Sequence, residues 1–103
     1  MIISTTESIG RTYEIIGIVN CSTVQTVNAF KDIGAGLKTL VGGELTKYNE
    51  MMDKARAMAT ERMIREAEAL GANAVVGVRY SSASVMQGAA EIMAYGTAVK
   101  FRD

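Results

Sequence analysis

One uninterrupted segment, residues 46–70, constrains the fold of this chain more than any other part. It contains neither Gly nor Pro and is rich in Ala, Met, Glu, Lys and Arg, all of which favour helix. Its apolar residues recur at steps of three and four, which predicts one buried face. They are Tyr48, Met52, Ala55, Ala59, Met63, Ala67 and Leu70. We therefore expect one long helix, with Thr46 as its N-cap and Gly71 as the residue that ends it.

Short segments rich in β-branched and aromatic residues predict three strands around this helix. Residues 11–20 precede it, and residues 72–81 and 91–102 follow it. The connection 82–90 is too short for a parallel crossover, so the last two strands should pair as an antiparallel hairpin. Residues 2–6 are a candidate for a short additional edge piece.

Residues 21–45 carry no clear periodicity, and several glycines interrupt them. We expect a loop there, with a helical turn or two at residues 24–31. The glycines match neither GxxxxGK[ST] nor GxGxxG, so a tight turn or close backbone approach explains them better than a phosphate-binding loop. The predicted fold class is α+β: a single two-layer β-α-β-β domain over residues 1–103, with the helix on a three-stranded antiparallel sheet.

Apolar side chains alternate onto both faces of the predicted strands. In the first strand, Ile15 and Val19 share one face and Ile16 and Ile18 share the other. A helix of about 25 residues is roughly 38 Å long and covers only one face of a sheet. The second face would be an apolar patch of the kind that soluble monomers rarely expose. Self-association, often cyclic, is the simplest cover. The alternative is that residues 21–44 fold back over this face.

Composition excludes several classes of function. Eleven basic and eleven acidic residues cancel, so neither nucleic acid nor an anionic membrane surface is an expected partner. No apolar run approaches the roughly 20 residues of a membrane span. The start Met-Ile-Ile-Ser-Thr-Thr lacks the features of a signal peptide, which favours the cytoplasm. The chain has no His, which is the commonest general base, and the sequence shows no nucleophilic side chain paired with another residue that could act as its base. We therefore do not expect an enzyme.

Cys21 is the only cysteine and the one candidate metal ligand. A soft-metal site needs three or four converging thiolates or imidazoles, which a single copy of this chain cannot supply. One cysteine per subunit could gather round the axis of a symmetric ring, so we consider Cys21 only across a subunit interface. A small buried hydrophobe is its ordinary interpretation. Packing explains the helix methionines better than Cu(I) binding; they are Met51, Met52, Met58 and Met63.

Four motifs carry a resemblance to a known family. They are VGGELTKY at 41–48, Ala55 with Arg56, ALGANAVVGVRY at 69–80 and AYGTAVKF at 94–101. In this order they resemble the YbjQ-like family of small bacterial and archaeal proteins over nearly the whole chain. The resemblance implies a dodecin-like β-α-β-β subunit assembled as a pentameric ring. The family is labelled as heavy-metal-binding, without a ligand set that transfers here, and Cys21 lies outside all four motifs.

The functional expectation follows from the apolar sheet and the resemblance together. We expect a non-enzymatic homo-oligomer, a ring of five copies, that serves as a scaffold or binds a small ligand. The alternative is a heavy-metal ion bound at a subunit interface, which is the only cofactor we consider. Dodecins bind flavins between aromatic residues, notably Trp, and this chain has no Trp. An enzyme that uses carboxylate or tyrosine chemistry between subunits is a third hypothesis, without a supporting motif.

Overall fold

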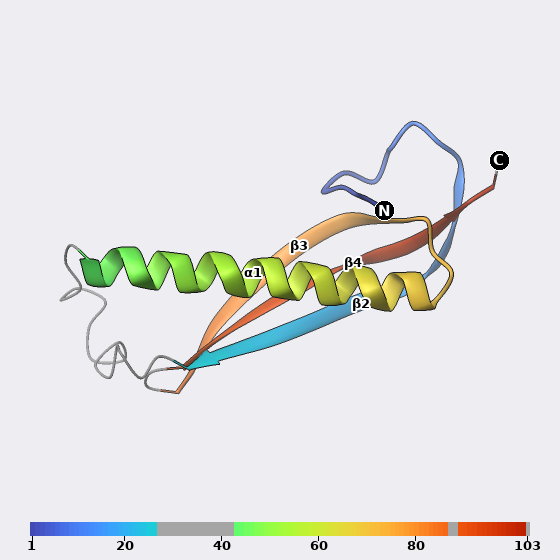
Figure 1. The fold of residues 1–103 in the computed structure, drawn as a ribbon. Helices are drawn as coiled ribbons and strands as arrows, with labels where there is room; N and C mark the ends of the chain where they lie inside the picture. Colours follow the sequence, from blue (N-terminus) through green and yellow to red (C-terminus); the bar gives the residue numbers. More distant parts are fainter. Residues whose placement is uncertain (27–42, 87–88, 103) are drawn as a thin grey trace.

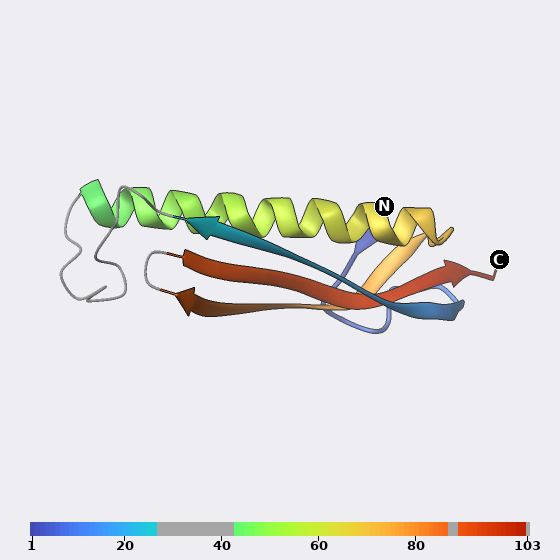
Figure 2. The ribbon, with the colours of Figure 1, turned by 90° about the horizontal axis from the view of Figure 1, so that it is seen from below.

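The fold has two layers, a single helix lying along one face of a sheet. The computed structural model describes residues 1–26, 43–86 and 89–102. Its elements, in chain order, are β1 (Ile2–Ile3), β2 (Tyr13–Thr26), α1 (Gly43–Ala69), β3 (Ala74–Met86) and β4 (Ala89–Phe101). The three long strands follow the helix along its length and all lie on the same side of it (Figures 1 and 2).

The sheet has four strands in the order β1-β3-β4-β2. The central strand β4 pairs antiparallel with both β3 and β2, as expected for the long strands. In contrast, β1 pairs parallel with the start of β3, and Ile2 lies opposite Ala74. The expected three-stranded antiparallel sheet is therefore corrected to a mixed sheet of four strands. The segment before β2 is long enough to lie beside β3. Its contact with β3 continues after the end of β1, where Val78 N–H donates to Ser4 O at 2.9 Å.

The helix ends where the sequence predicts and begins earlier. Gly71 has φ +82°, the left-handed conformation expected of a residue that stops a helix. Its N–H donates to Glu68 O at 2.9 Å, and Ala72 N–H donates to Ala67 O at 3.0 Å. The expected N-cap at Thr46 is wrong, because the helix already begins at Gly43.

Two strands are longer than the sequence predicts. The strand β2 continues through 21–26, and β3 continues to Met86 through residues expected to be a loop. Serines and threonines give little strand signal alone, but here β4 supplies hydrogen-bonding partners: Ser22 lies opposite Met93, and Ser82 opposite Ile92. The helical turns expected at 24–31 are wrong as far as Thr26, and their remainder lies outside the described residues.

The main core lies between α1 and the sheet. The helix contributes Ala55, Ala59, Met63 and Ala67, all fully buried, as the predicted stripe requires. They pack against strand residues Val19, Val75, Val78, Ile92, Ala94 and Ala98. Leu70, at the end of the predicted stripe, is 49% exposed instead. The many small side chains let the helix lie close to the sheet.

Bulges in two strands alter which residues face the helix. In β2, pairing shifts between Ile15 and Gly17, so Ile16 packs toward the main core while Ile15 and Ile18 both face away from it. The expected sharing of one face by Ile15 and Val19 is therefore wrong. In β3, pairing shifts between Val76 and Arg79 across Gly77, whose φ is +63°. The bulge inserts one extra residue into the strand at each site.

The sheet face opposite α1 is only partly covered. At one end a small cluster forms from Ala74, Val76 and Val99 with Ile9, Tyr13 and Phe101. Beyond it, the face exposes large apolar side chains: Ile15 (70%), Ile18 (76%), Val24 (54%) and Tyr95 (38%). We call these four residues the open face. The alternative cover, residues 21–44, lies largely outside the described residues, and its described part to Thr26 is a strand of the sheet itself.

Candidate functional site

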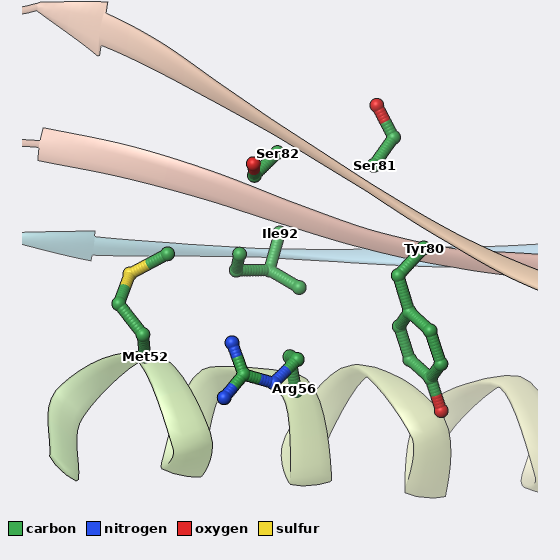
Figure 3. A pocket seen from close by; sticks show the side chains of 6 residues that line it. All are labelled: Met52, Arg56, Tyr80, Ser81, Ser82 and Ile92. Atoms are coloured by element: carbon green, nitrogen blue, oxygen red, sulfur yellow. The ribbon is translucent and has the colours of Figure 1, made fainter. Parts of the chain in front are cut away.

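A pocket of about 170 Å³ lies between α1 and β3 (Figure 3). The helix contributes Met52 and Arg56, spaced by four residues and therefore on one side of α1. The strands contribute Tyr80, Ser81, Ser82 and Ile92. The pocket thus combines a cation and hydroxyl groups with two apolar side chains. Its helix residues have longer side chains than the alanines that the helix contributes to the main core.

Tyr80 crosses from β3 to the helix and forms a wall of the pocket. Its Oη lies 2.7 Å from Thr60 Oγ1. Thr60 Oγ1 in turn donates its only proton to Arg56 O at 2.7 Å. The Tyr80 hydroxyl must therefore be the donor to Thr60. This pair fixes the aromatic ring against α1, although Tyr80 remains exposed on one side.

Of the residues that the structure describes, Arg56 alone brings a charge to the lining of the pocket. It forms an ion pair with Asp53, three residues earlier on the helix, through one guanidinium nitrogen. No other acceptor among the described residues bonds to this guanidinium, so that part of the chain engages only a minority of its five donors. In Figure 3 the guanidinium lies beside Met52 and Ile92, at the apolar side of the pocket.

A second hollow, of about 140 Å³, lies on the other side of the Tyr80 ring. Ile3, Ser4, Thr5 and Val78 line it together with Tyr80. Arg79, next to Tyr80 in sequence, ties the N-terminal segment to this part of β3 by donating to Thr5 O at 2.9 Å. Tyr80 therefore separates two hollows along the outer side of β3.

Cys21, the predicted candidate ligand, lies elsewhere. It is half-buried against the main core, on the β2 face that meets the helix. Its Sγ lies 3.9 Å from Glu66 Oε2, a long contact with a single carboxylate. In the part of the chain that the structure describes, no three residues of the types His, Cys, Asp and Glu come together as a metal site. Cys21 does not line the pocket and does not belong to the open face.

No direct signal in the sequence predicts the pocket. Charged helix residues ordinarily form a solvated surface, and only its place in a family motif distinguishes Arg56 in the sequence. The four-residue spacing of Met52, Arg56 and Thr60 is the one local signal, because it sets an apolar, a basic and a hydroxyl side chain in a row. Which strand packs against these three residues depends on how the strands pair in the sheet, and the local spacing does not predict that.

Within the described residues, no helix is both long and apolar enough to cross a membrane.

Comparison with known proteins gives consistent matches over the whole chain. The model of the YbjQ-like family, described as "Putative heavy-metal-binding", matches residues 1–102. A UPF0145 protein of Clostridium novyi is 54% identical over 101 residues, which cover 97% of this chain and 98% of that protein. A UPF0145 protein of Thermosipho africanus is 59% identical over 104 residues, which cover 99% of this chain and 96% of that protein.

A solved structure shares the fold. It is the crystal structure of a protein of unknown function of the DUF74 family from Pediococcus pentosaceus, with a TM-score of 0.73. The match covers 98% of this chain and 97% of that one, at 21% sequence identity. At this identity the likeness extends to the arrangement of helix and strands and no further.

Proposed function

The chain belongs to the YbjQ-like family, and on that premise we propose that it is a non-enzymatic cytoplasmic protein that assembles into a ring of identical subunits and binds a small ligand. The open face of the sheet is the observation that carries the proposal. Ile15, Ile18 and Val24 from β2 and Tyr95 from β4 are exposed on neighbouring strands. Exposed apolar groups gathered in this way usually mark a protein interface.

The shape of the subunit supports an assembly. Its extents are 53 × 21 × 15 Å and its radius of gyration is 16.6 Å. A compact domain of about 100 residues has a radius of gyration near 13 Å. The chain is therefore long and thin, with one helix on one face of the sheet. Contact with neighbours would cover the other face, as a third layer does in a compact monomer.

The sheet also has two long edges that can pair with another copy. β2 is an outer strand over its whole length, and β1 covers only the beginning of β3. Val78 N–H points outward to Ser4, and because amide direction alternates along a strand, Tyr80 and Ser82 N–H point to the same edge. Unpaired edges of this kind favour pairing with a further strand.

The direction of the edges favours a ring over a two-fold dimer. β2 and β3 run the same way, because both are antiparallel to β4. The β2 edge of one copy can therefore lie beside the β3 edge of the next with all copies oriented alike, a head-to-tail contact that closes into a ring. We propose five copies, the number that the family resemblance implies.

The test is the mass of the assembly in two matched variants. Ile18→Lys places a charge on the open face, and Leu70→Lys makes the same change at an exposed apolar residue at the end of the helix. Native mass spectrometry should give one oligomer for the wild type and for Leu70→Lys, and mainly monomer for Ile18→Lys, because burying an unpaired charge is costly. A wild type that is monomeric at every concentration would contradict the proposal.

A second candidate function is heavy-metal binding between subunits. The contact between Cys21 Sγ and Glu66 Oε2 favours it, since a thiolate and a carboxylate from each copy would together supply the ligands that one chain lacks. Cd(II) titration should then show fewer than one ion per subunit and a thiolate-to-metal absorption band. Cys21→Ser should abolish both, and Glu68→Gln, on the same helix, should change neither. Unchanged binding in Cys21→Ser would exclude this site.

A further inference from the structure

The size of the pocket between α1 and β3 limits what it can hold. Its volume of about 170 Å³ is close to the roughly 150 Å³ of an engineered cavity that binds benzene. A molecule with one six-membered ring, or an aliphatic chain of similar volume, fits this space. A nucleotide or a flavin would extend out of it.

The chemistry of the lining is divided between two sides. Met52 and Ile92 offer an apolar surface, whereas Arg56 and Ser82 offer donors. Among the described residues no acidic side chain lines the pocket, and the positive charge of Arg56 is the only formal charge that they bring to it. A guanidinium matches the geometry of a carboxylate or phosphate, which it binds through charge-assisted hydrogen bonds.

Tyr80 adds to this selectivity without offering a proton. Its hydroxyl already donates to Thr60, which donates to the backbone of Arg56. The ring therefore acts as a fixed wall, and donors to a ligand come from Arg56 and from Ser82. Asp53 is the internal competitor, because its carboxylate occupies one guanidinium nitrogen in the absence of a ligand.

From these contacts we propose that the pocket binds a small organic anion, with its carboxylate or phosphate on Arg56 and its apolar body between Met52 and Ile92. The inference rests on the proposed function, since it names the class of the small ligand. The arrangement is that of many ligand sites, in which an apolar surface supplies affinity and a few polar groups fix orientation. An anion would share Arg56 with Asp53 or replace that carboxylate.

The experiment compares benzoate with benzamide, which has nearly the same shape and no charge. Two-dimensional NMR on the intact protein should show benzoate shifting the amide signals of Tyr80 and Ser82 and the methyl signal of Met52. Benzamide should bind about 10-fold more weakly, as the loss of a charged hydrogen bond implies. Phenyl phosphate distinguishes the two anions: tighter binding than benzoate assigns the site to phosphate esters, and weaker binding assigns it to carboxylates.

Three variants test the residues. Arg56→Gln should weaken benzoate binding about 10-fold, and Arg62→Gln, the same change elsewhere on the helix, should leave it unchanged. Asp53→Asn should strengthen it several-fold by removing the competitor. Equal binding of benzoate and benzamide, or an unaffected Arg56→Gln variant, would overturn the proposal.

Native mass spectra of the same samples separate this inference from the assembly. An oligomer that does not bind benzoate overturns the pocket assignment and leaves the ring standing. A monomer that binds benzoate through Arg56 supports the pocket and overturns the ring.

Discussion

The two faces of the sheet differ in the size of the apolar side chains that they carry. On the helix side the buried residues are mostly small, with Ala94, Gly96 and Ala98 along β4. On the open face the residues are large, and Ile18 and Ile15 are the most exposed of them. A protein that works as a monomer ordinarily buries its largest apolar groups. The small residues allow close approach within one chain on the helix side, and the large residues of the open face are those that the proposed assembly would bury.

Truncation of a large buried residue should have the greatest effect on stability. Met63→Ala removes the largest fully buried side chain of the main core and should lower the free energy of unfolding by about 2–5 kcal/mol. Ile18→Ala on the open face should lower it by an amount that grows with protein concentration, because its effect acts through association. Urea unfolding at several protein concentrations measures both. A concentration-independent loss in Ile18→Ala would remove the distinction between the faces.

Addition of one methyl group tests how close the packing is on the helix side. A Cβ at Gly96 would lie 2.7 Å from Val75 Cγ1 and 3.1 Å from Val76 O. Gly96→Ala should therefore cost about 1–3 kcal/mol through overpacking. Gly17→Ala is the control, since a Cβ there meets no atom within 4 Å. Thermal unfolding of the two variants should separate them by several degrees, and equal midpoints would contradict the close packing inferred here.

Neighbouring hydroxyl residues of β2 allow the same comparison for a hydrogen bond. Thr23 is buried toward the helix and donates from Oγ1 to Ala55 O at 3.2 Å, whereas Ser22 lies on the other side of the strand. Thr23→Val should cost about 1 kcal/mol, and Ser22→Ala much less. Denaturant midpoints measure the difference. A larger loss for Ser22→Ala would show that its side of the sheet is buried in the working protein.

The smallest effect is expected on the solvent side of the helix. Glu61 and Arg65 form an ion pair between exposed side chains one turn apart. Glu61→Gln should lower stability by a few tenths of a kcal/mol. The difference should vanish at about 1 M salt, where exposed charges are screened within a few ångströms. Unfolding in low and high salt checks this, and a loss that persists in high salt would mean that this surface is also covered.

Local signals predicted the helix well, and the structure shows why they were sufficient. The spacing of Ala55, Ala59, Met63 and Ala67 defines the buried stripe, and Gly71 ends it through its backbone conformation. Both features depend on residues within a turn or two of each other. The YbjQ-like resemblance was confirmed by the family match over residues 1–102.

The predictions that were wrong concern residues whose conformation depends on strands far away in sequence. Ser22 and Ser82 become strand residues because β4 lies beside them, and the parallel pairing of β1 depends on where β3 begins. The pocket, too, depends on residues that are far apart in sequence. Arg56 lines a hollow only because β3 brings Tyr80 across to Thr60, and nothing near Arg56 in sequence indicates that neighbour.

The bulge at Gly77 affects how β3 can change in length. Side chains of a strand alternate between faces, so deleting a residue at an ordinary position turns all later side chains over. Gly77 is the additional residue of the bulge, and Val75 and Val78 on either side of it both face the helix. Deleting Gly77 alone would cancel the bulge and leave Val78 and Tyr80 on their present faces. It is therefore a position in β3 at which evolution can remove one residue, at the expense of local twist, while the pocket keeps its wall.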